Sequence, residues 1–324
     1  MLGRMVGNCI GRFGPDYPLG GVAGLLRRAD LAIVNLECAI TDSMVHWRGA
    51  AKAFYFGAPL NAVLSLTGAG VKLASLANNH LLDFDVQGLH DTIAALDRSG
   101  ILHAGAGSDL PAARAPAIVE RKGTRIGMAA FCDHQRDFAA GPDHAGIAWL
   151  DLAHDAGALA AFEQALTPLK AAQVAWPILS LHWGPKLAWR PSAAFRRLAH
   201  AAIEMGWKLV FGHSAHVFQG IELYKSCPIL YAAGDLVDDY VVDPDFRNDH
   251  QLLFELELEG NSLGRILLHP LFIARCRTAP ADAAQAQCIA ARMGTLCAEL
   301  GTRLDSTRLP WTITPAPYRA PSSG

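Results

Sequence analysis

Short apolar runs rich in β-branched residues recur along the chain, and each ends in polar residues or glycine. Apolar runs of this length, bounded by turn-forming residues, are typical of strands buried on both faces of a sheet. We therefore predict six buried strands, at residues 31–37, 71–80, 125–133, 176–184, 208–216 and 228–235.

Stretches with helical periodicity lie between these runs, at residues 86–100, 157–173 and 195–206. Gly100 and Gly206 stand where glycine commonly ends a helix. Alternation of strands and helices predicts an α/β layer architecture.

The pattern changes after residue 250. Two apolar runs, at 251–260 and 265–276, follow one another without a helix between them, which predicts an antiparallel hairpin closing a sheet. We take residues 1–276 as the main domain and residues 277–324 as a helical extension whose Pro/Ser-rich tip is loosely ordered.

Composition narrows the classes of partner. With 324 residues, 51% of them apolar, the chain can bury one large core, and a net charge of −2 argues against a nucleic-acid or anionic-membrane surface. A small-molecule partner fits better.

No apolar run reaches the roughly 18 to 20 residues that span a bilayer, and the start lacks a signal-peptide pattern, so we expect a cytoplasmic protein without stable membrane insertion. Nothing indicates the oligomeric state.

Polar residues gather just past the carboxyl ends of the predicted strands, which is where ligands bind in open α/β sheets. They are Glu37, Asn78, Asn79, His80, Cys132, Asp133, His182, His213, His216 and Asp235.

Singly, these residues have structural explanations. His182 fits a hydrogen-bonded core histidine, Glu37 a helix cap or an arginine partner, and the two asparagines a tight turn. His213 and His216 could form an H-x-x-H pair by chance among 13 histidines. We expect four loop histidines to be solvated, namely His46, His103, His134 and His144.

Jointly, oxygen ligands from Glu37 and Asn79 with imidazoles from His182, His213 and His216 suit Mn, Fe or Zn rather than Ca. Two such ions could activate water and stabilise an in-line displacement.

Six motifs in the same order resemble the CapA family of poly-gamma-glutamate capsule biosynthesis proteins, a branch of the calcineurin-like metallophosphoesterase superfamily. They are NLECAIT at 35–41, KAFYFGAP at 52–59, SLANNHLLDF at 75–84, LHWGP at 181–185, GHSAHVFQGIE at 212–222 and ILYAAGDLVDDY at 229–240.

The resemblance implies an α/β fold of two packed mixed β-sheets, a β-sandwich core flanked by helices, with two divalent ions at the strand ends. By motif, Glu37 looks like the bridging carboxylate, and Asn79, His182, His213 and His216 look like further metal ligands. His80 looks like the acid that protonates a leaving oxygen, a role typically worth ~10² to 10⁴ in rate.

The chain departs from the family pattern at two places that bear on the site. Members usually open with a strand ending in G-D-V-M-L-G-R, whose Asp is a ligand, whereas this sequence starts at the Met of that string. We therefore expect either that the start codon is placed too late or that this version lacks that strand and that ligand. Pro185 and Lys186 also replace an acidic residue that commonly follows H-W-G. We predict contacts to an anionic substrate from Arg4, Asn78, Lys186 and Asp235.

Three hypotheses follow. The first is a metal-dependent hydrolase of a phosphoester or related anionic bond. The second is a non-catalytic factor in making or exporting an anionic polymer such as poly-gamma-glutamate. The third is a fragment weakened by the loss of a core strand, since a domain is typically held together by only about 5 to 15 kcal/mol.

Overall fold

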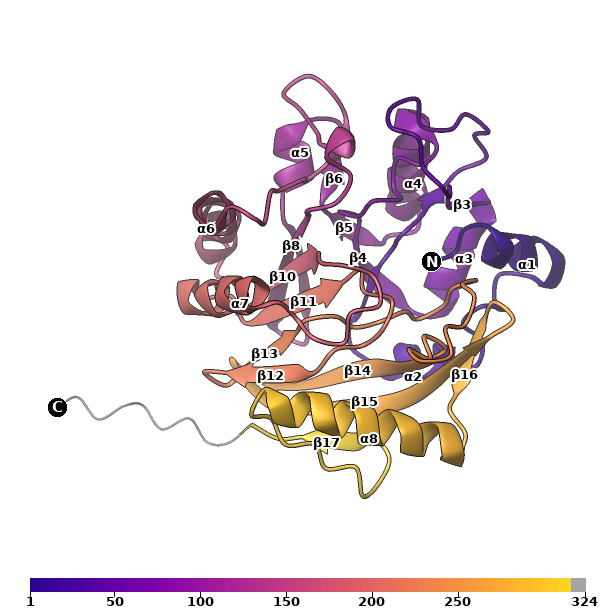
Figure 1. The fold of residues 1–324 in the computed structure, drawn as a ribbon. Coiled ribbons are helices and arrows are strands. Elements are labelled where there is room, and N and C mark those ends of the chain that lie inside the picture. Colours follow the sequence, from indigo (N-terminus) through magenta and orange to yellow (C-terminus); the bar gives the residue numbers. More distant parts are fainter. Residues whose placement is uncertain (316–324) are drawn as a thin grey trace.

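A six-stranded sheet forms the centre of the fold in the computed structural model, which describes residues 1–315 (Figure 1). Its strand order is β12-β13-β11-β10-β8-β7. The four central strands are parallel, and β7 and β12 are antiparallel edges. The strands are β7 (Ala117–Arg121), β8 (Thr124–Cys132), β10 (Trp176–His182), β11 (Leu209–His213), β12 (Ile221–Tyr224) and β13 (Cys227–Leu230).

A second, three-stranded parallel sheet packs against this one, with order β1-β4-β5. It consists of β1 (Ala32–Asn35), β4 (Val71–Ser75) and β5 (Leu102–Ala104). The Oγ atoms of Ser75 on β4 and Ser180 on β10 lie 3.0 Å apart, so the two sheets meet directly face to face. The predicted α/β class is confirmed; the six-stranded sheet is mixed and the three-stranded sheet is parallel.

Helices α6 (Asp155–Ala171) and α7 (Ala193–Met205) cover the other face of the six-stranded sheet (Figure 1). Side chains on β10 alternate accordingly. Leu179 and Leu181 pack in the core shared with the helices, and Ile178 packs in the core shared with the second sheet. Residue 182 therefore points toward the second sheet.

A third sheet is antiparallel and is formed by the C-terminal part of the chain, which includes the predicted hairpin. Its strands are β14 (His250–Glu259), β15 (Ser262–Ala274), β16 (Arg277–Pro280) and β17 (Trp311–Ile313). Helix α8 (Ala283–Glu299) begins with a capping box at Asp282 and buries Ile289 and Met293 in the main core. Residues 277–315 thus pack on the fold, and the predicted loose tip at 316–324 lies outside the described residues.

The predicted strands and helices are present, with ends shifted by a few residues. Gly206 ends α7 in the left-handed conformation with φ 118°. The sequence pattern missed the short or amphipathic elements. These are α1 (Met5–Phe13), α2 (Ala23–Arg28), β2 (Ala39–Ile40), β3 (Gly57–Ala58), α3 (Val63–Gly68), β5, β6 (Ala106–Gly107), α5 (Leu110–Arg114), β7, β9 (Gly146–Ile147), β12, β16 and β17. Helix α4 (Asp85–Arg98) is one of the predicted helices.

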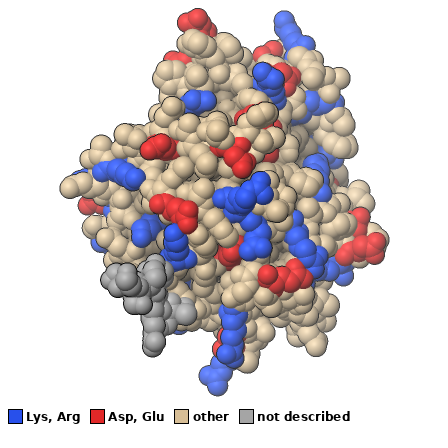
Figure 2. Space-filling model, turned by 60° about the vertical axis from the view of Figure 1, so that its left-hand side comes forward, with Lys and Arg blue, Asp and Glu red and all other residues tan. Residues whose placement is uncertain are grey.

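Lysine and arginine side chains are interspersed with acidic ones on the face shown in Figure 2. Among residues 1–315, no helix is both long and apolar enough to cross a membrane.

Gly212 offers a test of how tightly β11 packs. A Cβ at this position would lie 2.0 Å from the carbonyl oxygen of Tyr231. Backbone of the neighbouring strand cannot move aside easily, so we expect Gly212→Ala to lower the free energy of unfolding by about 1–3 kcal/mol. Urea denaturation monitored by circular dichroism would measure the change.

Gly157 in α6 is the matched control, because nothing lies within 4 Å of an added Cβ there. Gly157→Ala should stabilise the protein by roughly 0.5–1 kcal/mol, since glycine is unfavourable inside a helix. Equal effects of the two substitutions would contradict the packing described for β11.

Candidate metal centre

Three parallel strands present one row of metal-binding residue types at the same edge of the six-stranded sheet. The register pairs His182 on β10 with Cys132 on β8 and with His213 on β11. Because neighbouring residues in register share a face, all three side chains point toward the second sheet. The row therefore lies between the two sheets, and its members are almost fully buried.

Glu37 faces this row from the end of β1. Its side chain is only 3% exposed, and Asn35 fixes one oxygen by donating a 3.1 Å hydrogen bond from Nδ2 to Oε2. The other oxygen, Oε1, has no hydrogen-bond partner among residues 1–315. A buried carboxylate oxygen without a donor is costly, so it marks a place where a cation would be stabilised.

The Nε2 atoms of His182 and His216 each lie 3.8 Å from Glu37 Oε1. This separation is too long for a hydrogen bond. Atoms that each bind an ion at about 2.0–2.2 Å lie at a comparable spacing from one another. Glu37 Oε1 and the two imidazole nitrogens are therefore spaced so that they could hold a divalent ion.

His182 is oriented by a chain of polar contacts. Its Nδ1 lies 2.8 Å from Nδ1 of His213, and Nε2 of His213 lies 2.9 Å from Oγ of Ser180. Because Ser180 donates to Ser75, its oxygen accepts a hydrogen bond from Nε2 of His213, and Nδ1 of His213 accepts one from Nδ1 of His182. Nε2 of His182 therefore keeps a free lone pair toward Glu37.

Burial, reinforced by the neighbouring histidines, holds the pKa of His182 well below its usual range. Burial likewise lowers the pKa of His213 to about 3. Neutral imidazole is the form that binds an ion. Both ring nitrogens of His213 already contact other side chains, so in this structure the residue orients His182. Its predicted role as a metal ligand stays a prediction.

His216 sits on a strained turn after β11. Ser214 and His216 have φ of 107° and 58°, a region that residues other than glycine rarely occupy and that clusters at functional sites. Both carboxylate oxygens of Asp235 lie 3.1 Å from Nδ1 of His216. Burial alone would lower the pKa of His216, but the charges of Asp235 and Glu37 outweigh it and raise that pKa.

Asp235 thus contacts a candidate ligand, an arrangement in which a carboxylate fixes the ring and tautomer of a metal-binding histidine. Its predicted contact with substrate stays a prediction. Gln251 on β14 supports the same turn: its Nε2 donates to the His216 carbonyl at 3.0 Å, and its Oε1 accepts from the Asp235 amide at 3.0 Å.

His80 follows β4 and is held by a residue that the sequence pattern missed. Nδ1 of His80 lies 2.7 Å from Oδ2 of Asp83, and Lys52 Nζ lies 2.5 Å from the other oxygen of that carboxylate. Lys52 also donates to the Asn79 carbonyl. Burial lowers the pKa of His80, with the Asp83 carboxylate opposing that effect. The signal available in the sequence was Asp83, three residues after His80.

The two asparagines have different surroundings. Asn78 is fully buried, donates to Asn35 and to the Leu36 carbonyl, and accepts from the His80 amide, so its polar groups are used within the protein. Oδ1 of Asn79 is buried without a hydrogen-bond partner in the described chain. Asn79 is therefore the asparagine with a free ligand atom. Asn78 supports the surrounding backbone, and its predicted contact with substrate stays a prediction.

Two predicted substrate-binding cations lie near this region. Nε of Arg4 pairs with Asp239 at 3.2 Å, and its guanidinium covers the rings of Phe54 and Phe56. Lys186 Nζ lies 4.9 Å from the centre of the Tyr240 ring, and that ring packs against His216 at 4.8 Å. Aromatic rings therefore lie between each of these two cations and the candidate metal centre.

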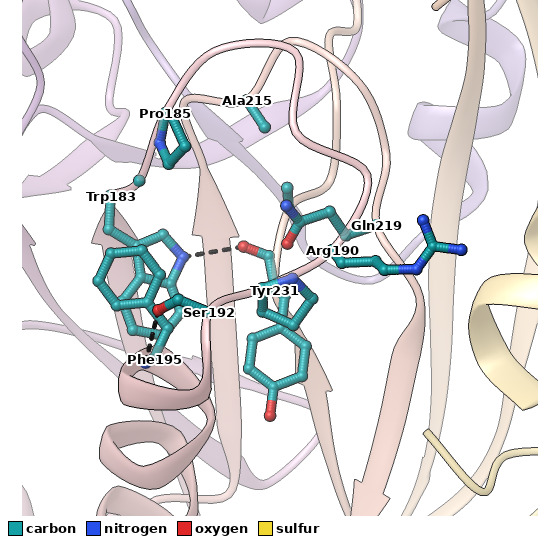
Figure 3. Close-up of a pocket in the computed structure, with 11 residues that line it drawn as sticks. Trp183, Pro185, Arg190, Ser192, Phe195, Ala215, Gln219 and Tyr231 are labelled. Atoms are coloured by element: carbon teal, nitrogen blue, oxygen red, sulfur yellow. Dashed lines mark hydrogen bonds between the residues drawn. The ribbon is translucent and has the colours of Figure 1, made fainter. Parts of the chain in front are cut away.

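A small hollow is lined in part by the loop that follows β10 (Figure 3). The Trp183 indole donates to the Tyr231 carbonyl at 2.8 Å there, and Arg190 borders it while pairing with Glu299. None of the predicted site residues lines this hollow. We therefore place the candidate chemistry at the histidine cluster.

The expectation that loop histidines are solvated was wrong for His103, whose side chain is 18% exposed, and only partly right for His134, whose side chain is 35% exposed. Its ring packs edge to face against His182 with centroids 5.4 Å apart, and its Nδ1 atom is buried. His144, by contrast, is exposed as expected.

The comparison with protein families agrees with the six sequence motifs. Residues 1–240 match the family model described as bacterial capsule synthesis protein. The chain belongs to the CapA family.

Its relatives in this family include a probable polyglutamine synthesis accessory protein of Mycobacterium tuberculosis, 35% identical over 81% of this chain and 71% of the relative. The capsule biosynthesis protein CapA of Bacillus anthracis is 28% identical over 74% of this chain and 58% of that protein. The PGA biosynthesis protein CapA of Bacillus subtilis is 26% identical over 86% and 71%.

Lys52 gives a test of the support beneath this CapA-family site. Its side chain is 8% exposed and Asp83 is completely buried. We expect Lys52→Met to lower the free energy of unfolding by about 3–5 kcal/mol, because it leaves a buried carboxylate without its cation. Thermal and urea denaturation would measure the loss.

Lys122→Met is the matched control. Lys122 pairs with Asp30 on the surface, where its side chain is 77% exposed. Such pairs contribute about 0–1 kcal/mol. A loss as large as that of Lys52→Met would show that the effect does not come from burial.

Proposed function

We propose that this protein is a metal-dependent hydrolase of phosphoester or related anionic bonds that acts in capsule or poly-gamma-glutamate synthesis. The observation that carries this proposal is the unpartnered Oε1 of buried Glu37, faced at 3.8 Å by Nε2 of both His182 and His216. The family membership and the names of the relatives support the capsule context.

The residues that would hold divalent ions are Glu37, Asn79, His182 and His216, with His213 adjoining them. Carboxylate, amide and imidazole ligands suit Mn, Fe or Zn. Bound there, such ions would supply Lewis-acid stabilisation of a phosphoryl oxygen and a lowered pKa for water.

The protein's own contribution centres on His80. Asp83 can only accept a hydrogen bond as a carboxylate, so Nδ1 of His80 is the donating nitrogen in their 2.7 Å contact. Nε2 is then the nitrogen left to face a leaving oxygen, and it can donate a proton there when the ring is in its doubly protonated, imidazolium form. Lys52 and the Phe56 amide hold Asp83 in place, so the ring is oriented before substrate arrives.

The substrate we propose is a small anionic molecule or one end of an anionic polymer. Arg4 and Lys186 are the cations that could contact its negative groups. Both are held on aromatic rings, which limits the side-chain freedom lost on binding.

A non-catalytic role in anionic-polymer synthesis is the second candidate. It is favoured by the name of the Mycobacterium tuberculosis relative, a probable polyglutamine synthesis accessory protein. It predicts saturable binding of poly-gamma-glutamate that persists after chelation and in His80→Ala.

Activity assays distinguish the two. Protein reconstituted with Mn²⁺ should hydrolyse p-nitrophenyl phosphate or its bis-ester, and His80→Ala should lower kcat by ~10² to 10⁴ because the leaving group goes unprotonated. His90→Ala, an exposed change on α4, should leave kcat unaltered. Stoichiometric metal without turnover of either ester would overturn the hydrolase proposal.

A further inference from the structure

Two groups of metal-binding residue types meet at Glu37 and His182, whose Oε1 and Nε2 atoms lie 3.8 Å apart. Glu37 itself, His216 and Asp235 form one group, and Cys132, His134 and His182 form the other. Within each group the ligand atoms lie within 4.8 Å of one another. Neither Cys132 nor His134 belongs to the ligand set expected from the family resemblance.

Strand register places Cys132 in the second group. It is directly paired with His182 across the β8–β10 ladder, and it is completely buried on the face that points toward Glu37. The thiol also contacts the backbone of His134, whose amide lies 3.4 Å from Sγ. This contact brings residue 134 back toward the end of β8.

His134 has an uncommitted ring nitrogen. Its Nδ1 is buried and lies 3.2 Å from Oδ1 of Asp133, yet neither atom has a hydrogen bond of acceptable geometry among residues 1–315. The ring meets His182 edge to face. Two buried polar atoms without partners, beside a thiol and a second imidazole, indicate a place for a cation.

We propose that Cys132 and His134 complete, with His182 and Glu37, a four-ligand site selective for Zn²⁺ or Co²⁺ over Mn²⁺. One sulfur, two imidazole nitrogens and one carboxylate oxygen make a set that favours a borderline-soft ion in tetrahedral geometry. Binding as thiolate releases the Cys132 proton to solvent. The site rests on the proposed function in sharing Glu37 and His182 with the proposed hydrolase centre, and it adds Cys132 and His134, which lie outside that ligand set.

Cobalt alone is the probe. Metal-free protein titrated with Co²⁺ should develop a near-ultraviolet sulfur-to-cobalt charge-transfer band, and competition with Zn²⁺ should remove it. Cys132→Ser should abolish the band and weaken Co²⁺ binding at this site by more than the roughly 10–100-fold typical of losing an outer-shell partner. Cys227→Ser, a change on β13 away from the row, should leave the band intact.

His134→Ala serves where Cys132→Ser perturbs folding, because His134 is only partly buried. It should weaken Co²⁺ binding while a thiolate band remains at high cobalt. His216→Ala should lower the total metal content but spare the band. A band absent from the parent protein, or one that survives Cys132→Ser, would overturn the proposal.

The outcome is separable from that of the proposed function. A thiolate band in a protein that hydrolyses neither ester would sustain this inference and reject the hydrolase. Ester hydrolysis with Mn²⁺ and no band with Co²⁺ would do the reverse.

Discussion

The register of three parallel strands is the constraint on which the site depends. β8, β10 and β11 end at the same level, and their last residues share one face, so Cys132, His182 and His213 form a row without any loop having to arrange them. Glu37 reaches the row from the opposing sheet. Because the Ser75–Ser180 contact fixes the separation of the sheets, the packing of the core also sets the distance between Glu37 and the histidines.

Three candidate ligands around this row, Glu37, His182 and His216, each have one polar atom fixed by a neighbouring residue and another without such a partner in the described chain. Asn35 fixes Glu37, Asp235 fixes His216, and the His213–Ser180 relay fixes His182. Such outer partners set the tautomer and orientation of a ligand. Oε1 of Glu37 and Oδ1 of Asn79 have no hydrogen-bond partner among the described residues, which is a cost to the fold that a bound cation would relieve.

Much of the fold was predictable because its central strands are continuous apolar runs ending in polar residues. The same pattern located Glu37, His80, His182 and His216, since ends of parallel strands meet at one edge. Lys52 was not predictable, because it lies in a segment without regular structure and reaches Asp83 only through the tertiary fold. His134 was misjudged for a related reason: its loop folds back onto the strand end, and no periodicity reveals that.

Gln251 connects the C-terminal hairpin to the turn that carries His216. The family model ends at residue 240, yet this side chain, fully buried on β14, holds both the carbonyl of His216 and the amide of Asp235. The strained turn at His216 is thus braced by a strand beyond the matched segment. The smallest unit able to preserve the ligand geometry therefore extends through β14 and its partner β15, beyond the segment that the family model matches.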